Sequence, residues 1–208
     1  MDVIVFDIDG TLLDASDTDT KLYLQSIRTV LGDVEFRSEV SAYDHVTDLG
    51  ILRTIIRDNG LPADDALVTR IKQEFLGSLQ HHLETHSPFR EVSGAKGFVH
   101  ALHSSENAAI AYATGDWRAS VRLKLQASGF PLQGIPLASS DDHEERASIM
   151  LRAVSGLAVE TNRITYYGNG VWDRAACEAL GWRFVAVGAA LGGIKSYVGH
   201  DSDAVTSF

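Results

Sequence analysis

The chain has 208 residues, of which 45% are apolar and 22% are charged. This composition is that of an ordinary globular protein, and it excludes a disordered chain or a fibrous repeat. The 18 basic and 28 acidic residues give a net charge of -10, which argues against a nucleic-acid-binding surface and favours a small-molecule partner. The single cysteine, Cys177, excludes an intrachain disulfide and a cysteine metal cluster, so a cytoplasmic location is expected.

The first predicted element is a strand at residues 3–6, where four apolar residues follow one another without polar alternation. Such a run is typical of a strand that is covered on both faces of a parallel sheet, and it is too short for an export signal or a membrane span. Further strands are predicted at 108–113, 164–167 and 184–187, with a weaker one at 135–138. Helices are predicted at about 94–104, 117–128, 144–154 and 173–180. This alternation predicts an α/β fold with a Rossmann-like parallel sheet.

Residues 15–91 lack strand signals and carry apolar residues at helical spacing instead. The apolar series lie at 22–31, 49–56 and 67–79. We therefore expect an all-helical unit at 15–91, inserted into a discontinuous core built from 1–14 and 92–208. The chain would pass from the core into the helical unit near 14–19 and return near 87–93, and these two connections would form the hinge between them.

Oxygen-bearing residues follow the predicted strands at the points where these end. The segments are Asp7-Ile8-Asp9-Gly10-Thr11, Thr114-Gly115-Asp116 and the stretch from Gly168 to Asp173. Because ligands of open parallel sheets bind at the carboxyl ends of the strands, these segments are predicted to share one site.

These segments resemble the motifs of the haloacid dehalogenase superfamily of phosphohydrolases and phosphotransferases. Residues 7 to 11 match its first motif, DxDGT, without a gap, Thr114 matches the hydroxyl motif, and Arg146 matches the basic motif. Residues 168–173 match the acidic GDxxxD loop except that Asn169 replaces the first aspartate. The position of the helical unit, inserted as a cap after the first motif, resembles that in phosphoglycolate-phosphatase-type and β-phosphoglucomutase-type members of the superfamily.

The resemblance implies a phosphatase that hydrolyses a small phosphate monoester, with phosphoglycolate as the leading candidate, through an aspartyl-phosphate on Asp7. Asp9 would act as general acid and then as general base, and its presence favours phosphate-ester over carbon–halogen chemistry. The Thr114 hydroxyl and the Gly115 amide would donate to the phosphoryl oxygens, and Arg146 would supply positive charge. Gly10 and Thr11 of the first motif are expected to contact the substrate.

The cofactor that this chemistry implies is Mg²⁺, because the candidate ligands are all oxygen atoms. They are the Asp7 carboxylate, the Asp9 carbonyl, Asn169 and Asp173. Since Asn169 is neutral, we expect weaker metal binding than an aspartate would give. Thr47 or Asp48 is expected to cap the helix that follows and to direct its amides towards an anionic group of the substrate.

Alternative interpretations stay open at this stage. A phosphosugar mutase or another phosphotransferase fits the same motifs, as does a catalytically weak, phosphate-binding regulatory protein. Asp173, Thr47 and Asp48 could serve as ordinary helix caps. Arg146 could be a surface charge, since Lys124 and Arg152 also lie on predicted helices. A zinc role for the histidines at 81, 82 and 86 is disfavoured. The expected partner is a small phosphorylated metabolite, and neither nucleic acid nor a membrane is expected to bind. The protein is expected to be a monomer or a homodimer.

Overall fold

The computed structural model describes residues 1–62, 64–158 and 160–200, and the last eight residues of the predicted core lie outside this part. Within it, five parallel strands form one sheet in the order β3-β2-β1-β4-β5. The strands are β1 (Asp2–Phe6), β2 (Ala108–Ala113), β3 (Leu137–Ala138), β4 (Ile164–Gly168) and β5 (Arg183–Ala186). The predicted parallel α/β fold is confirmed.

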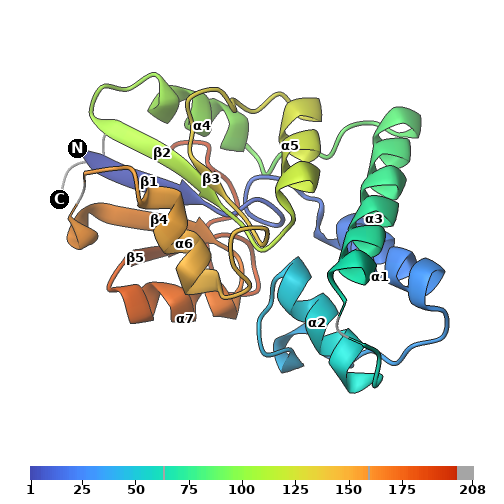
Figure 1. Cartoon of the computed structure of the whole chain (residues 1–208). Coiled ribbons are helices and arrows are strands. Elements are labelled where there is room, and N and C mark those ends of the chain that lie inside the picture. The colour runs from blue at the N-terminus through green and yellow to red at the C-terminus, as the bar shows by residue number, and fades with distance from the viewer. Residues whose placement is uncertain (63, 159, 201–208) are drawn as a thin grey trace.

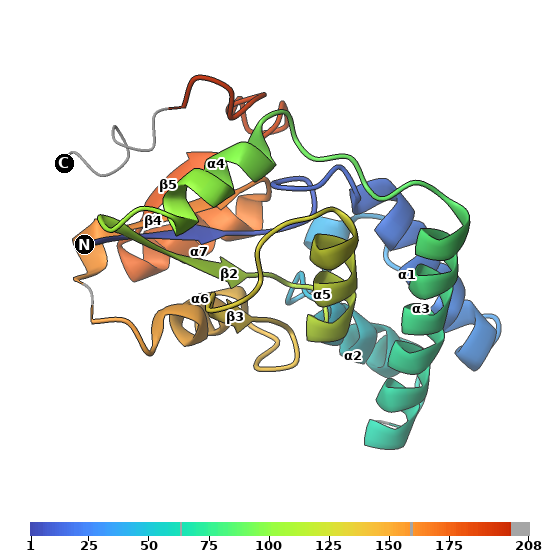
Figure 2. The ribbon, with the colours of Figure 1, turned by 90° about the horizontal axis from the view of Figure 1, so that it is seen from above.

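Helices cover both faces of the sheet (Figures 1 and 2). On one face lie α4 (Ala95–His103) and α5 (Arg118–Ala127), which pack against Ile4 and Phe6 of β1. On the other lie α6 (Arg146–Val154) and α7 (Val171–Leu180), which pack against Val3 and Val5. Because successive side chains of a strand point to opposite faces, burial on both sides explains the uninterrupted apolar run of β1.

The structure adjusts some predicted boundaries. The helix predicted at 173–180 begins at Val171, because Gly170 already serves as its N-terminal cap residue. It ends as expected at Gly181, whose positive φ of 68° favours glycine. The weak strand signal at 135–138 corresponds to the two residues of β3. Two short 3₁₀ helices lie at Val40–Ala42 and Thr161–Arg163.

A helical unit at residues 16–85, the α1–α3 unit, stands beside the carboxyl edge of the sheet (Figure 1). It consists of α1 (Ser16–Leu31), α2 (Asp48–Asp58) and α3 (Asp65–Thr85), which share an apolar core of their own. The two chain segments that join it to the sheet run side by side. Asp14 N donates to Arg90 O at 2.8 Å, and Val92 N donates to Leu12 O at 2.9 Å. Among the described helices, none has the length and apolar character needed to cross a membrane.

The α1–α3 unit is docked on the sheet through specific contacts. Trp117, from the loop after β2, packs against Tyr23 of α1 and Phe75 of α3, with ring centroids 5.5 and 5.7 Å apart. The Trp117 amide donates to Asp48 Oδ2 at 2.8 Å, and Thr47 Oγ1 donates to Glu144 O at 2.8 Å. The unit therefore covers the edge of the sheet at which the strands end.

Candidate active site

The register of the sheet brings the predicted segments to one edge. Phe6 at the end of β1 pairs with Tyr112 of β2 and with Tyr167 of β4. The residues that follow these strands therefore meet, and a cavity of about 470 Å³ lies between them and the α1–α3 unit. Its lining on the side of the sheet consists of Asp7, Asp9, Gly115, Asp116, Arg146, Asn169 and Trp172.

Asp7 is buried at the base of this cavity. Its Oδ2 accepts a hydrogen bond from Thr11 Oγ1 at 3.4 Å, and its Oδ1 accepts one from Arg146 Nη1 at 3.3 Å. Burial and the nearby Asp173 carboxylate raise the pKa of Asp7 to about 7, although Arg146 opposes the shift. The site thus concentrates negative charge around a carboxylate that points at the cavity.

Arg146, the first residue of α6, links three parts of the site. Besides Asp7, its guanidinium lies 3.3 Å from Asp173 Oδ1 and donates to the Val46 carbonyl of the α1–α3 unit at 3.3 Å. Burial alone would lower the pKa of Arg146, but the surrounding acidic groups, Asp173 first, raise it. The side chain is therefore a fixed positive charge beside Asp7.

Asp173 makes two contacts, of which the helix cap was one of the alternatives that the sequence left open, while its role towards a metal stays a prediction. Its Oδ2 accepts from the Gly170 amide at 3.0 Å, which caps the start of α7, and its Oδ1 faces Arg146. Asn169 lies against the first motif, because a Cβ atom on Gly10 would come within 1.9 Å of Asn169 Nδ2. Gly10 also has a φ of +76°, so glycine is required there on both grounds.

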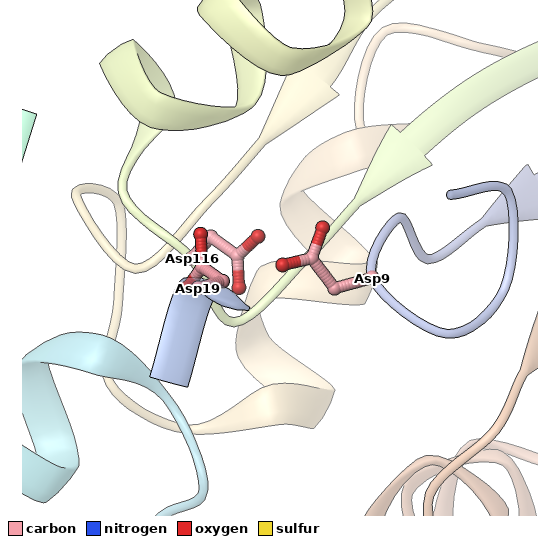
Figure 3. Close-up of side chains that lie close together, drawn as sticks. All are labelled: Asp9, Asp19 and Asp116. Atoms are coloured by element: carbon pink, nitrogen blue, oxygen red, sulfur yellow. The ribbon is translucent and has the colours of Figure 1, made fainter. Parts of the chain in front are cut away.

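A buried lysine binds an acidic cluster next to the cavity (Figure 3). The carboxylates of Asp9, Asp19 and Asp116 face one another closely enough to hold a metal ion. Lys124 of α5, however, donates to all three, at 2.6 Å to Asp9 Oδ2, 2.7 Å to Asp19 Oδ1 and 2.8 Å to Asp116 Oδ2. Burial alone would lower its pKa, but these carboxylates raise it, so an ammonium ion already serves as the cation of this cluster.

The two carboxylate oxygens of Asp9 have different surroundings. Oδ2 is bound to Lys124, whereas Oδ1 is buried and has no hydrogen-bond partner within the described part of the chain. Burial and the Asp116 charge raise the pKa of Asp9 well above its ordinary value, while Lys124 opposes the shift. Asp9 can therefore carry a proton on an oxygen that belongs to a cavity-lining side chain.

The residues present fit a magnesium ion beside Asp7 better than at the Lys124 cluster. The carboxylates of Asp7 and Asp173 and the amide of Asn169 offer the hard oxygen donors that Mg²⁺ prefers. The mutual repulsion that raises the pKa of Asp7 is what a divalent cation would relieve. This fit rests on the chemistry of the donors and on the excess of negative charge.

Other predicted site residues lie near the cavity in less direct positions. Thr114 is buried at the end of β2, and its hydroxyl accepts from the Asp116 amide at 3.3 Å. Thr47 caps α2 by accepting from the Gly50 amide, and the Asp48 amide donates to Gly115 O at 2.8 Å. Thr47 and Asp48 both line the cavity, but their role towards a substrate stays a prediction.

Lys124 was expected only as an alternative basic-motif residue. Asp116 belongs to one of the predicted site segments, but Asp19 and the contacts of Lys124 with these two carboxylates were not predicted. The helical spacing of the sequence could have indicated that this lysine is buried. Val121 and Leu125 of α5 are buried, and position 124 falls on the same stripe of the helix. A lysine at such a position is stable only when opposite charges accompany it.

Comparisons with known proteins agree with the fold. A family model described as haloacid dehalogenase-like hydrolase matches residues 1–181. No curated protein matches the sequence significantly.

Several solved structures share the fold at low sequence identity. CbbY from Rhodobacter sphaeroides in complex with phosphate has a TM-score of 0.71 at 16% identity, covering 97% of this chain and 90% of that one. β-Phosphoglucomutase from Clostridium difficile has a TM-score of 0.68 at 12% identity, covering 90% of this chain and 85% of that one. A predicted phosphoglycolate phosphatase from Haemophilus somnus has a TM-score of 0.60 at 18% identity, covering 90% and 85%.

Proposed function

The chain belongs to the haloacid dehalogenase-like hydrolases, and from this premise we propose that it is a Mg²⁺-dependent phosphatase that hydrolyses a small phosphate monoester through an intermediate on Asp7. The observation that carries the proposal is the pairing of Asp7 with Asp9 in one cavity. Asp9 is held at Oδ2 by Lys124 and keeps Oδ1 without a partner among the described residues. This is the arrangement that a nucleophile and a separate acid require.

In the first step, an Asp7 carboxylate oxygen attacks the phosphorus atom of the ester. A bond from Asp7 oxygen to phosphorus forms while the bond from phosphorus to the leaving oxygen breaks. The proton on Asp9 passes to that oxygen, so the product leaves as a neutral alcohol. Arg146, 3.3 Å from Asp7, offsets the charge of the incoming phosphate.

In the second step, water attacks the phosphorus atom of phospho-Asp7. Asp9, now ionised, accepts a proton from the water as the new bond forms. The bond between Asp7 and phosphorus breaks, which releases inorganic phosphate and restores both side chains. The same residue therefore serves first as acid and then as base.

The cofactor would be held by Asp7, the Asp9 carbonyl, Asn169 and Asp173. When bound, Mg²⁺ supplies positive charge that reduces the repulsion between the carboxylate nucleophile and the phosphate dianion. Without such screening, a pair of unit charges 4 Å apart repels by about 4 kcal/mol at an effective dielectric near 20. In this scheme the α1–α3 unit acts as a cap that excludes bulk water.

The proposal is tested with p-nitrophenyl phosphate, a generic substrate. We expect turnover in the presence of Mg²⁺, loss of turnover in chelator, and loss in Asp7→Asn at any Mg²⁺ concentration. Asp33→Asn, at an exposed position outside the cavity, is the matched control and should keep wild-type activity. Equal rates in wild type and Asp7→Asn would refute the phosphatase and favour a binding protein.

A phosphosugar mutase is the second candidate, supported by the structural similarity to β-phosphoglucomutase. Both activities share the first step and differ in the acceptor of the phosphoryl group, which is water or a sugar hydroxyl. Incubation with hexose monophosphates separates them, because a mutase yields a positional isomer and a phosphatase yields inorganic phosphate.

A further inference from the structure

The two walls of the cavity differ in chemistry. The wall formed by the strand ends carries the charged groups described above. The wall formed by the α1–α3 unit contains an apolar and aromatic surface made by Tyr23, Leu24, Phe36, Val40, Tyr43 and Ile51, which is called the apolar wall. Polar lining residues of the same unit lie beside it, namely Ser16, Asp19, Thr20, Arg37, Ser38, Thr47 and Asp48. Val40 of this wall is 47% exposed. A phosphoryl group at Asp7 would direct its leaving group towards this wall.

Two polar side chains beside the apolar wall, Arg37 and Thr47, are already bound within the protein. Arg37 donates from Nε to Asp58 Oδ2 at 2.8 Å and from Nη2 to Asp58 Oδ1 at 3.3 Å, and its Nη1 donates to the Ala42 carbonyl. Thr47 is used by the Glu144 carbonyl and the Gly50 amide. A polar leaving group could therefore bind Arg37 or Thr47 only by displacing these bonds.

The charge around the cavity disfavours a second anionic group. Its lining includes five aspartates, at 7, 9, 19, 48 and 116. Among the described lining residues the basic side chains are Arg37 and Arg146, and each is paired with a carboxylate. Lys124 and Arg146 bind four of these aspartates, but two cations do not balance five carboxylates. An additional carboxylate on the leaving group would thus meet net negative charge at short range.

We propose that the cavity accepts phosphate monoesters of apolar alcohols, alkyl or aryl, and rejects leaving groups that carry a carboxylate or a second phosphate. This inference rests on the phosphatase activity proposed above and specifies its substrate class. Trp172 extends the apolar surface from the opposite side of the cavity. Phosphoglycolate, which carries a carboxylate, would then be a poor substrate.

A series of n-alkyl phosphates tests this preference, because ethyl, butyl and hexyl phosphate have leaving groups of nearly equal intrinsic reactivity. Each methylene that contacts the apolar wall should raise kcat/KM roughly threefold, so hexyl phosphate should exceed ethyl phosphate by about tenfold if two of its four additional methylenes make contact and by about eightyfold if all four do. Phosphoglycolate should fall below ethyl phosphate. A flat series, or phosphoglycolate as the best substrate, would overturn the inference and leave the phosphatase standing. Absence of hydrolysis for every ester would overturn both.

A substitution in the apolar wall tests whether this wall causes the preference for apolar leaving groups. Phe36 is half-buried beneath Arg28, whose guanidinium lies 4.6 Å from the ring centroid. Phe36→Ala should reduce the ratio of hexyl to ethyl kcat/KM by about three- to tenfold. This ratio is independent of the amount of folded enzyme, so a loss of stability cannot imitate the effect. Phe184→Ala, on β5 away from the cavity, is the matched control and should leave the ratio unchanged. An unchanged ratio in Phe36→Ala would contradict the assignment of this wall.

Discussion

Lys124 Nζ lies 2.6 Å from Asp9 Oδ2, and this contact joins the proposed acid to a fully buried positive charge. The same ammonium binds Asp19, in the first turns of α1, and Asp116, in the loop after β2. Lys124 therefore connects the first motif, the sheet edge and the α1–α3 unit. The other oxygen of Asp9, Oδ1, is buried and has no hydrogen-bond partner among the described residues.

Lys124→Met should destabilise the protein strongly at neutral pH. Three buried or half-buried carboxylates would lose their common counter-ion, and breaking a buried ion pair by removing one partner costs about 3–5 kcal/mol. Urea unfolding at pH 7 measures the loss. Lys21→Met, at an exposed position on α1, is the control and should change the free energy of unfolding by less than about 0.5 kcal/mol. Similar small effects in both variants would mean that the carboxylates do not depend on Lys124.

Asp9→Asn should impair catalysis according to the leaving group. A general acid contributes about 10²–10⁴-fold for a leaving group that needs a proton, such as the ethanol of ethyl phosphate. The loss should be much smaller for p-nitrophenyl phosphate, whose phenolate leaves without protonation. Steady-state kcat/KM for both esters checks this, because kcat/KM reports the steps up to the formation of phospho-Asp7 and not the second step, in which Asp9 acts as base. Asp19→Asn, which also disturbs the Lys124 cluster, should slow both reactions to a similar extent. Equal losses for both esters in Asp9→Asn would exclude Asp9 as the acid.

Asn169→Asp should tighten the binding of Mg²⁺. The substitution adds a negative charge beside Asp7 and Asp173, where the cofactor is proposed to bind, and hard cations favour carboxylate over amide ligands. The Mg²⁺ concentration for half-maximal activity should fall about tenfold or more, and calorimetric titration should show the same shift. Asn162→Asp, at an exposed position in the second 3₁₀ helix, should alter neither measurement. Unchanged or weaker Mg²⁺ dependence in Asn169→Asp would place residue 169 away from the metal.

The sheet could be predicted because its central strands are buried on both faces. Residues 3–6 and 108–113 read as continuous apolar runs, and helical spacing between the runs implied parallel strands. The weakest signal, at 135–138, corresponds to an edge strand of two residues that needs few apolar side chains. Parallel strands then bring Asp7 and residues 168–173 to one edge without further information.

The Lys124 cluster could not be predicted in the same way, because it depends on how the α1–α3 unit docks. Asp19 is separated from Lys124 by 105 positions, and no periodicity in α1 indicates that its first turns face α5. The docking itself involves Trp117, which lies in a loop and packs against both Tyr23 and Phe75. Such contacts follow from tertiary packing and leave no local pattern in the sequence.

The stability of the metal-free protein should fall as the pH rises from about 5 to 8. Burial and Asp173 raise the pKa of Asp7 to about 7 in the folded state, whereas an aspartate in the unfolded chain titrates near 3.9. Between these values the folded state binds more protons than the unfolded state, so raising the pH favours unfolding until Asp7 is ionised in both. A shift of this size corresponds to at most about 4 kcal/mol.

Urea unfolding in chelator at pH 5 and pH 8 measures this dependence of stability on pH. The variant Asp7→Asn tests whether Asp7 causes it. The variant cannot ionise at position 7, so it should lose less stability over this range than the wild type and should be the more stable protein at pH 8. Asp33→Asn, at an exposed site, should retain the wild-type difference. Added Mg²⁺ should restore stability to the wild type at pH 8, because a ligand that binds the folded state alone stabilises it. If the free energy of unfolding of Asp7→Asn and of the wild type fell by the same amount between the two pH values, Asp7 would not be the carboxylate with the raised pKa. Its place as the buried nucleophile beside Asp173 would then have to be abandoned.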